Sequence, residues 1–405
     1  MIYNREKVLK EIKPSEEEIE KGLKLYRKIK DFIHRKYNLE AELQGSFIKG
    51  TSLKGDKDLD IFIFFPLETS MVELKKKALE IGKNVFEEFD GKYEIKYAEH
   101  PYVNGKIENH DIDIVPCYKI EKIEQMKSSV DRTPLHTKFV LENMNEKQKD
   151  DTRILKKFMK LINVYGSEFK IMGFSGYLCE LLILYYGSFE NVIKEASKWR
   201  FKQKIVFEKI EKDFSDPLII IDPVDSSRNA ASCVSLQKFS EFIYYSRKFL
   251  KDKKFEEIKT EYKKSEGTEL IVLNFNTDLI EDLLFPQLRK TRDFIKGYLE
   301  KNDFRIYRSK VFNSGILFEL EVFELPKMKI HRGPFVYDEK NCENFIEKHN
   351  KVFITGDRLC TEVERKFRTA KECIEFLIKK REGFGKDLKK VECFITDDEI
   401  KELYD

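Results

Sequence analysis

Hydrophobic residues near the start of the chain recur with helical spacing. Ser15 and Glu18 form a capping-box pattern, and apolar residues follow at positions 19, 23, 26, 29 and 33. This spacing predicts an amphipathic helix packed on a core. The stretch 59–65 is rich in β-branched and aromatic residues and stops at Pro66, so we expect a strand there and a helix over 72–89.

The next segment, 93–118, has the composition of β structure. It contains Asn104-Gly105, a dipeptide typical of hairpin turns. An apolar strand is then expected from Ile112 to Cys117, with Asp111 just before it and Asp113 within it.

From residue 150 to about 249 the pattern is mostly helical, broken by the short apolar strand in "PLIIIDPVD". A charged stretch over 251–269 indicates a boundary, either a linker or a solvated helix. Beyond it we expect strands at "LIVLNF", "GILFELEVFEL" and "TEVERKF", a helix over about 288–299, and a helix starting near Thr369. The fold class is therefore multidomain α+β: an N-terminal mixed sheet with helices, a mainly helical central domain, and an α+β C-terminal body and tail.

Composition sets broad limits on the molecule. With 405 residues the chain is long enough for two to four domains, and 37% charged against 41% hydrophobic residues is typical of a globular protein. The longest apolar run, 178–186, is interrupted by Glu180 and is far shorter than the roughly 20 residues of a membrane span. We therefore expect no membrane association.

The expected location is the cytoplasm. The N-terminus lacks the apolar segment of a secretory signal, and the 7 cysteines show no CxxC pair or metal-ligand spacing. They are best interpreted as reduced core residues. The net charge of +3 is too small to indicate a nucleic-acid partner by itself.

Two acids open the apolar strand in the stretch "LQGSFIKGTSLKGDKDLDIFIFF", residues 43–65. Asp58 and Asp60 are two positions apart, so on a strand they face the same side, and Asp113 joins them if its strand is a neighbour. Clustered carboxylates raise one another's pKa unless a cation neutralises them, and hard oxygen ligands select Mg²⁺ or Mn²⁺. A lone Asp-x-Asp at a strand entrance is more often simply solvated.

The preceding loop favours the functional interpretation. Gly45 and Ser46 offer backbone N–H groups and a hydroxyl to phosphate oxygens, and Lys49 and Lys54 add positive charge. A Gly-Ser pair alone is common in surface loops. The combination of Gly-Ser, Asp-x-Asp and a further strand aspartate predicts phosphoryl-transfer chemistry, with the loop holding phosphates and the acids holding two metal ions.

At this point the sequence resembles a known superfamily. "GS", "DLDIFIFF" and "DIVPCY" are similar to the nucleotidyltransferase superfamily of DNA polymerase β. The further stretches "RTPLHTKF", "RILKKFMKLINVYGSEFKIMGFSGYLCELLILYYGSF", "DPVDSSRNAA" and "HRGPF" resemble the archaeal, class I CCA-adding enzymes. The resemblance is densest over 44–229 and continues more weakly to the C-terminus.

The resemblance implies template-independent addition of C, C and A to the 3′ end of tRNA from CTP and ATP. It implies a nucleotidyltransferase head at 1–147, a helical domain completing the nucleotide pocket at 148–255, an α+β body at 256–330, and a tail contacting tRNA at 331–405. Asp58, Asp60 and Asp113 match the catalytic, metal-binding carboxylates, with two Mg²⁺ ions expected and Asp113 as candidate general base. Asp111 is interpreted as solvated or supporting.

The resemblance also implies a set of nucleotide contacts. Ser46 matches a triphosphate-binding serine, whereas Lys49 stands where the family usually has arginine, so a bidentate contact becomes a point charge. Taken alone, each of the other matches has a structural alternative: a buried histidine, a solvated helical lysine or a core tyrosine. Arg228 matches an arginine that helps select cytosine and adenine. The implied set is Gly45, Ser46, Lys49, His136, Lys156, Tyr165 and Arg228.

Contacts to the tRNA acceptor arm are predicted from basic residues interleaved with aromatic ones and from a C-terminal motif. The candidates are Arg200, Lys202, Arg289, Lys290, His331 and Gly333. Ordinary solvated helices show the same interleaving of basic and aromatic residues. In the C-terminal motif, Phe335 replaces a proline that is common in the family. A homodimer is left open.

Three alternatives share part of this pattern. A poly(A) polymerase or a small-molecule nucleotidyltransferase would carry the same Gly-Ser and acids, but would not explain the downstream matches. A catalytically silent RNA-binding protein would be expected to have lost an acid, and all three are present.

Overall fold

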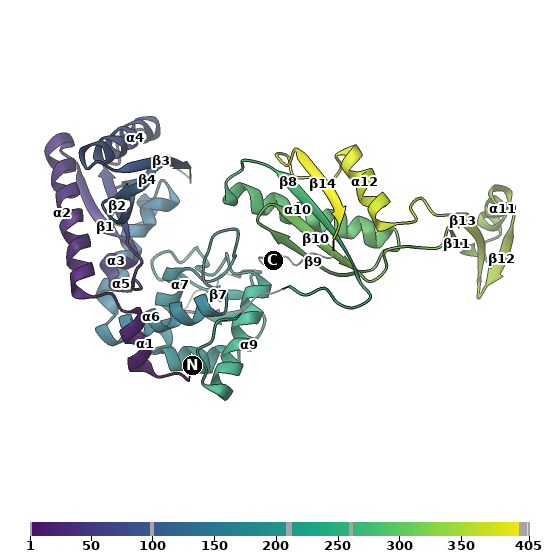
Figure 1. Ribbon diagram of the computed structural model, residues 1–405, viewed down its shortest axis with the longest axis horizontal. Coiled ribbons are helices and arrows are strands. Elements are labelled where there is room, and N and C mark those ends of the chain that lie inside the picture. Colours follow the sequence, from purple (N-terminus) through teal and green to yellow (C-terminus); the bar gives the residue numbers. More distant parts are fainter. Residues whose placement is uncertain (1, 98–100, 208–212, 259–261, 397–402, 404–405) are drawn as a thin grey trace. The chain divides into compact units, whose positions relative to one another are not determined.

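The computed structural model describes residues 2–97, 101–207, 213–258, 262–396 and 403. The chain divides into two compact units, Met1–Ile258 and Lys259–Asp405 (Figure 1). Each unit has its own hydrophobic core. In the part of the chain that is described, no helix combines the length and apolarity required to cross a membrane.

The first half of unit 1 is a five-stranded mixed sheet with strand order β1-β2-β5-β4-β3. Its central strands β2 and β5 are parallel and the other pairs are antiparallel. Residues of α2 and α4 pack on this sheet in one core cluster. The strands are β1 (Glu40–Gln44), β2 (Asp58–Phe65), β3 (Lys92–Tyr97), β4 (Pro101–Ile107) and β5 (His110–Tyr118), and the helices are α2 (Glu16–Tyr37), α3 (Gly45–Lys49) and α4 (Met71–Glu88).

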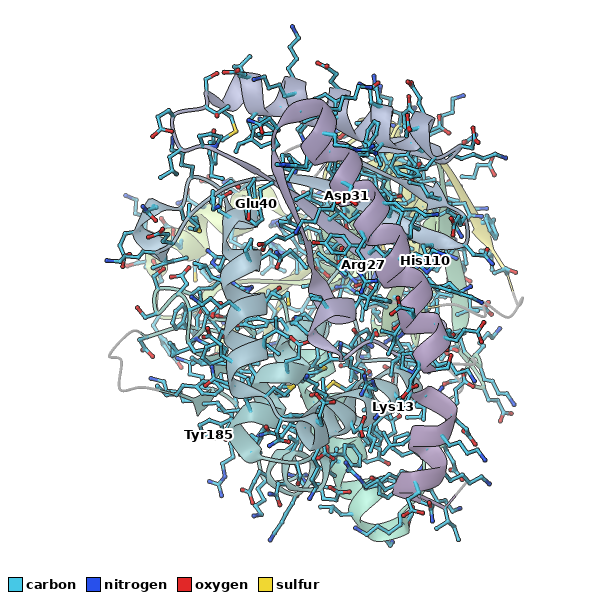
Figure 2. All side chains as sticks on the ribbon, turned by 90° about the vertical axis from the view of Figure 1, so that its left-hand side faces the viewer. Lys13, Arg27, Asp31, Glu40, His110 and Tyr185 are labelled. Atoms are coloured by element: carbon cyan, nitrogen blue, oxygen red, sulfur yellow. The ribbon has the colours of Figure 1, made fainter. Side chains whose placement is uncertain are left out.

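Helix α2 begins at the predicted capping box. The Ser15 hydroxyl accepts from the Glu18 N–H at 3.2 Å and the Glu18 carboxylate accepts from the Ser15 N–H at 2.9 Å, which satisfies two otherwise unpaired donors. The helix ends at Asn38, which adopts a left-handed φ of 54°. Its polar face carries Arg27 and Asp31, which are labelled on the side facing the viewer in Figure 2.

The second half of unit 1 is mainly helical. Its helices surround one large core cluster that also takes residues from α1 at the N-terminus. The two short strands in it pair in parallel. Elements are α1 (Arg5–Ile12), η1 (Ile123–Gln125), η2 (Ser129–Asp131), α5 (Arg132–Asn143), α6 (Glu146–Leu161), α7 (Gly176–Tyr186), α8 (Phe189–Ala196), β6 (Gln203–Ile205), β7 (Leu218–Ile220) and α9 (Leu236–Asp252).

Unit 2 contains a four-stranded antiparallel sheet of order β14-β8-β10-β9 and a three-stranded sheet of order β11-β13-β12. Helices α10 and α12 share the core of the larger sheet, and α11 contacts β11 of the smaller one. The elements are β8 (Glu269–Asn276), α10 (Glu281–Lys301), β9 (Ile306–Phe312), β10 (Gly315–Leu320), β11 (Met328–Phe335), α11 (Glu339–Lys348), β12 (Val352–Thr355), β13 (Arg358–Glu364), α12 (Ala370–Lys380) and β14 (Lys390–Ile395).

The expected α+β multidomain fold, with a mixed N-terminal sheet and a helical middle, is confirmed. The hairpin turn expected at Asn104-Gly105 is wrong, because both residues lie inside β4. The chain turns instead at Glu108, where φ is 52°. Gly105 is needed for close approach, since a Cβ there would lie 2.1 Å from the Lys92 carbonyl oxygen of β3.

The boundary expected between 330 and 331 does not divide two independent bodies. Strand β14, from the last part of the chain, pairs with β8 over Lys390–Ile395, and α12 packs in the same core. The segment 328–364 is instead an excursion between β10 and α12 with its own small sheet. The charged stretch beyond Asp252 has no helix in its described residues, 253–258 and 262–268.

Candidate active site

The sheet register brings the acids of β2 and β5 together. Asp60 is paired with Asp113 and Asp58 with Asp111, in parallel neighbouring strands. Because strand residues two apart share a face, all four carboxylates start from the same face of the sheet. The parallel pairing of β2 and β5 therefore brings Asp58, Asp60 and Asp113 to one face, as the sequence pattern predicted for neighbouring strands.

The four acids differ in surroundings. Burial first, and then the charges of Asp113 and Asp58, raise the pKa of Asp60 to about 7. Burial is also the main cause of the raised pKa values of Asp58 and Asp113. The Asp111 side chain is 45% exposed and forms an ion pair with Lys106 at 3.4 Å, as expected of a solvated carboxylate.

Asn104 supports Asp113 across the sheet. It is the register partner of Asp113 on β4, and its side-chain amide donates a hydrogen bond to Asp113 Oδ1. This bond holds the carboxylate in place and opposes the rise in its pKa. Asn104 thus belongs to the site, although its sequence context suggested a turn.

The donor set suits a hard divalent cation. Asp58, Asp60 and Asp113 supply only oxygen ligands, and none of them forms an ion pair with a described cation. Among the described residues, no three acidic, histidine or cysteine side chains are already close enough to hold a metal. The chemistry of the acids therefore fits the ion, and their present rotamers do not form a closed cage.

The Gly-Ser stretch lies directly against the acids. Gln44 pairs with Asp60 across β1 and β2, and Gly45 follows with a φ of 74°. A Cβ at Gly45 would lie 2.0 Å from Asp60 Oδ2, so only glycine fits there. Ser46 sits in the first turn of α3, and its hydroxyl has no hydrogen-bond partner within the described part of the chain.

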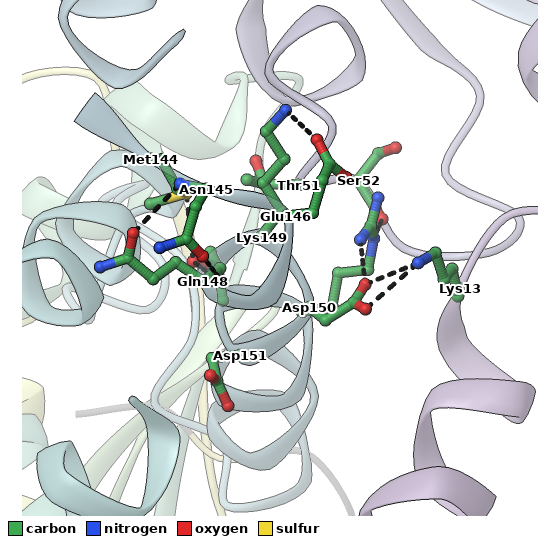
Figure 3. Close-up of polar contacts among 12 residues, drawn as sticks. Lys13, Thr51, Ser52, Met144, Asn145, Glu146, Gln148, Lys149, Asp150 and Asp151 are labelled. Atoms are coloured by element: carbon green, nitrogen blue, oxygen red, sulfur yellow. Dashed lines mark hydrogen bonds and ion pairs between the residues drawn. The ribbon is translucent and has the colours of Figure 1, made fainter. Parts of the chain in front are cut away.

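Helix α6 anchors the loop that follows. Arg153 Nε donates to the Ser52 carbonyl at 3.0 Å, and Lys156 Nζ donates to the Thr51 carbonyl at the same distance. Asp150, in turn, forms ion pairs with Arg153 and with Lys13 of the N-terminal segment, and Figure 3 shows the contact with Lys13. The loop between α3 and β2 is thus fixed by side chains more than 90 residues away in sequence, which sequence periodicity cannot reveal.

A buried ion network joins Lys49 and Lys156. Glu180 of α7 is fully buried, with Lys49 Nζ 2.5 Å from its Oε2, Thr51 Oγ1 2.5 Å from its Oε1, and Lys156 Nζ 4.0 Å away. Burial raises the pKa of Glu180 and the two lysines lower it, and the net effect is a decrease. Lys49 and Lys156 therefore lie together as the sequence implied, and both are engaged with Glu180.

Tyr165 lies beside this network. A side chain added at Gly176, the first residue of α7, would lie 3.2 Å from the Tyr165 hydroxyl and 3.4 Å from Lys156 Nζ. Lys160 lies over the Tyr165 ring at 5.3 Å, and burial raises the pKa of this tyrosine. A glycine at 176 thus avoids a Cβ that would crowd both polar groups.

A second buried carboxylate joins His136 and Arg228. Asp222 Oδ2 lies 2.8 Å from His136 Nε2 and 2.8 Å from Arg228 NH1, and its Oδ1 accepts from the Tyr177 hydroxyl at 3.0 Å. The Tyr177 ring stacks on His136 at 3.9 Å and lies 5.7 Å from Lys49 Nζ. The two carboxylate networks are therefore neighbours.

The candidates for tRNA contact fall in both units. Arg200 and Lys202 are exposed in a turn of unit 1, and Arg289 and Lys290 lie on α10 of unit 2. His331 and Gly333 lie on β11, where a Cβ at 333 would lie 2.5 Å from the Phe345 ring of α11. The packing against Phe345 thus accounts for a glycine at 333.

Sequence reasoning missed four polar residues of the site. Glu180 was read only as an interruption of an apolar run, and Thr51, Tyr177 and Asp222 were not singled out. A signal did exist for the two acids, since a lone carboxylate inside "LCELLILYY" or after "LIII" must be buried and therefore paired. Which cations pair with them is a question of tertiary structure.

Comparisons with known proteins cover almost the whole chain. Residues 26–145 match the family described as "Nucleotidyltransferase domain", residues 150–259 match "tRNA nucleotidyltransferase, second domain", and residues 266–397 match "CCA-adding enzyme, C-terminal domain". Relatives of similar length are found in archaea, and each is named a CCA-adding enzyme.

The protein from Methanocaldococcus jannaschii is 41% identical over 392 residues, covering 89% of this chain and 87% of the relative. The protein from Methanothermobacter thermautotrophicus is 37% identical over 404 residues, covering 94% and 89%. The protein from Saccharolobus islandicus is 40% identical over 371 residues, covering 89% and 88%.

A structural likeness supports the fold alone. The Cid1 poly(U) polymerase matches with a TM-score of 0.50 at 15% identity, over 63% of this chain and 98% of that one. The mixed sheet, its aligned aspartates and the adjoining Gly-Ser stretch define a nucleotidyltransferase of the DNA polymerase β type. Within that class the three matched families and the archaeal relatives are decisive. The chain belongs to the CCA-adding enzymes, the archaeal-type tRNA nucleotidyltransferases.

Proposed function

We propose that the chain adds C, C and A to the 3′ end of tRNA from CTP and ATP, and that Asp58, Asp60 and Asp113 carry the reaction. The observation that carries the assignment of these residues is the β2–β5 register, which pairs Asp60 with Asp113 beside Gly45. The class of reaction comes from the family to which the chain belongs.

The reaction is a nucleotidyl transfer. The tRNA 3′-oxygen forms a bond to the α-phosphorus of the nucleotide, the bond to the β-phosphate oxygen breaks, and pyrophosphate leaves. Asp113 is proposed to accept the proton of the 3′-hydroxyl. Burial raises its pKa, which makes it a stronger base, and the hydrogen bond from Asn104 keeps one of its oxygens oriented.

Asp58, Asp60 and Asp113 would hold two Mg²⁺ ions, which when bound neutralise the triphosphate and polarise the α-phosphate. The mutual repulsion of the acids and the raised pKa of Asp60 support this, because a site of that charge favours a cation. The Gly45 and Ser46 backbone and hydroxyl are proposed to contact the triphosphate next to these acids.

The remaining nucleotide contacts are proposed from the two buried networks. Lys156 and Tyr165, which both lie beside Gly176, are proposed to meet phosphate or ribose oxygens. His136 and Arg228, both fixed by Asp222, are proposed to face the base, where a planar guanidinium suits hydrogen bonding to base edges. Lys49 is proposed to act at longer range, since Glu180 holds its ammonium group.

The tRNA acceptor arm is proposed to contact the basic residues of both units. The candidates remain Arg200, Lys202, Arg289, Lys290 and His331. All seven cysteines are free thiols, which suits the reducing cytoplasm where we propose that the enzyme acts. A homodimer stays a prediction that light scattering of the purified protein would test.

The deciding experiment measures incorporation of each labelled nucleotide, with Mg²⁺, into tRNA transcripts that end before CCA, after C and after CC. Wild type is expected to stop after C, C and A. Long A tails would instead identify a poly(A) polymerase, and tRNA binding without incorporation would identify a silent RNA-binding protein.

Asp60→Ala is expected to abolish incorporation while tRNA binding persists. The matched control is Asp111→Asn, which removes a carboxylate from the same sheet face and is expected to keep activity, because Lys106 pairs with Asp111 in solvent. Equal loss in both variants would show that the face needs negative charge in general, and would contradict the assignment of Asp60 as a ligand.

A further inference from the structure

Asp222 lies in a rigid loop that follows β7. The Asp222 N–H donates to the Arg228 carbonyl at 3.1 Å, and Ile221 forms a bridge with Asn229. The Asn229 side chain braces the loop, accepting from the Ile220 N–H at 2.9 Å and donating to the Leu218 carbonyl at 2.9 Å. The backbone thereby fixes Asp222 opposite Arg228.

All acceptor positions of the Asp222 carboxylate are used within the protein. Oδ2 accepts from His136 and Arg228, and Oδ1 accepts from the Tyr177 hydroxyl and from the Val224 N–H at 3.1 Å. A carboxylate has about four such positions. Asp222, which is fully buried, therefore has no capacity left for a metal ion or a nucleotide, and its role must be exercised through its partners.

The bond to Asp222 decides which imidazole nitrogen of His136 carries a proton. A carboxylate can only accept, so Nε2 must be the donor, and Nδ1 of the neutral ring is then an acceptor. Burial lowers the pKa of His136, which favours that neutral form. Stacking on Tyr177 at 3.9 Å, with 21° between the planes, holds the ring orientation.

The same carboxylate sets the orientation of Arg228. In the part of the chain that the structure describes, Asp222 is the sole side-chain partner of the Arg228 guanidinium, through NH1. The side chain is 32% exposed, and only one of its guanidinium nitrogens is used by Asp222. One carboxylate therefore orients an acceptor, His136 Nδ1, and a set of donors, on Arg228.

We infer that Asp222 is a positioning residue for nucleotide selection: it fixes His136 and Arg228 in the orientation with which they recognise cytosine and adenine. This rests on the proposed function, in which His136 and Arg228 face the base. Selection of a base needs donors and acceptors at fixed places, since a misplaced group cannot discriminate between base edges. Asp222 fixes the positions of these donors and acceptors without contacting the nucleotide.

A purely structural role is the competing explanation. Unit 2 shows that it is realistic, because Glu319 is a fully buried carboxylate that binds Tyr262, Thr268 and Arg308, none of which is a proposed nucleotide contact. Loss of stability after mutation of Asp222 would therefore prove nothing by itself. The measurement has to be a ratio between nucleotides.

The test compares Asp222→Asn with wild type on the same transcripts, at a temperature well below the melting temperature of the least stable variant. The amide has one acceptor oxygen and an NH₂ group that donates, so it opposes the donors of His136, Tyr177 and Arg228. The ratios of kcat/KM for CTP over UTP and for ATP over GTP are expected to fall at least about tenfold.

Asp225→Asn is the matched control, since Asp225 is a buried carboxylate three positions further along the same loop that pairs with Arg132 instead. It is expected to lower the melting temperature and to keep both ratios. Unchanged ratios in Asp222→Asn would overturn the inference, and so would an equal fall in Asp225→Asn.

Tyr177→Phe covers the case in which Asp222→Asn does not fold. This variant keeps the stacked ring and removes one hydrogen bond to Asp222 Oδ1. Both kcat/KM ratios, CTP over UTP and ATP over GTP, are expected to decrease a few-fold. Unchanged ratios would refute the inference. A wild-type enzyme that adds no CCA in this assay would refute the proposed function. A wild-type enzyme that adds CCA, with variants that discriminate equally well, would refute only the role of Asp222.

Discussion

Replacing Glu180 by glutamine tests the buried ion network directly. The substitution keeps the size of the side chain and removes the charge that faces Lys49 at 2.5 Å and Lys156 at 4.0 Å. Removing one partner of a buried ion pair typically costs about 3 to 5 kcal/mol, because the other charge stays buried without compensation. Here two ammonium groups, with side chains only 8% and 2% exposed, are left behind.

The loss in free energy of unfolding caused by Glu180→Gln has an upper limit that depends on pH. Burial already lowers the pKa of Lys156, so in the variant this lysine can escape by losing its proton. The unfolded chain then binds more protons than the folded one, and the free energy of unfolding rises with pH. We expect Glu180→Gln to lose about 3 to 5 kcal/mol at pH 7 and to recover part of that loss towards pH 9.

Trp199 provides the assay. It is the single tryptophan of the chain, it is buried, and it lies in the helical part of unit 1, so its fluorescence during urea unfolding reports on that unit alone. A double-mutant cycle with Lys49→Met should show that the two costs are not additive, with a coupling of about 1 to 3 kcal/mol. Glu17→Gln, which breaks the exposed pair with Lys21, is the control and should change nothing measurable.

Two outcomes would refute this reasoning. The first is a loss below about 1 kcal/mol in Glu180→Gln, which is the range of exposed pairs. The second is additivity of the two single variants to within about 0.5 kcal/mol, which would show that Lys49 and Glu180 do not interact.

Two further predictions concern the acids. Because the pKa of Asp60 is raised to about 7, the folded state binds more protons than the unfolded state between about pH 4 and 7, so metal-free stability falls as pH rises through this window. At pH 8 the free energy of unfolding of Asp60→Asn should then exceed that of wild type by roughly 1 to 2 kcal/mol, after allowance for partial solvent exposure, so the variant should melt at a higher temperature. Added Mg²⁺ should stabilise only wild type. A lower melting temperature of the variant would contradict this prediction. Asn104→Ala should lower kcat about tenfold with little change in KM for CTP and move the acidic limb of the pH–rate profile upwards, since Asp113 loses the bond that opposes its raised pKa. Asn109→Ala in the following turn is its control, and equal effects would rule out a specific role for Asn104.

The acids could be predicted from sequence because the information is local. Two-residue spacing fixes the strand face of Asp58 and Asp60, whereas the contribution of Asp113 depended on its strand being a neighbour. The register then follows from the fold, with Asp60 opposite Asp113. Helix α2 was predictable for the same reason, since its cap is formed by residues three apart.

The buried networks could not be predicted because their members are distant in sequence. Glu180 meets Lys49 across 131 positions, and Asp222 meets His136 across 86. Asn104 and Gly105 were misread for a related reason. Their local signal indicates a turn, whereas cross-strand contacts with Asp113 and with the Lys92 carbonyl determine their identity. The return of β14 to β8 is another long-range pairing without a local signal.

The two sides of the proposed site differ in whether their buried charges are paired within the protein. In the helical half of unit 1, Glu180 pairs with Lys49 and Lys156, and Asp222 accepts from four donors, so both carboxylates are satisfied without a ligand. Asp58, Asp60 and Asp113 form no ion pair among the described residues, and burial, together with the charges of neighbouring carboxylates, raises their pKa values. Preorganised polar groups on one side can orient a nucleotide without rearrangement, while uncompensated carboxylates on the other create the demand for cations. Lys49 connects the two sides, because it is the last residue of α3, the helix that begins beside the acids at Gly45, and its ammonium group lies 5.7 Å from the ring of Tyr177, whose hydroxyl donates to Asp222.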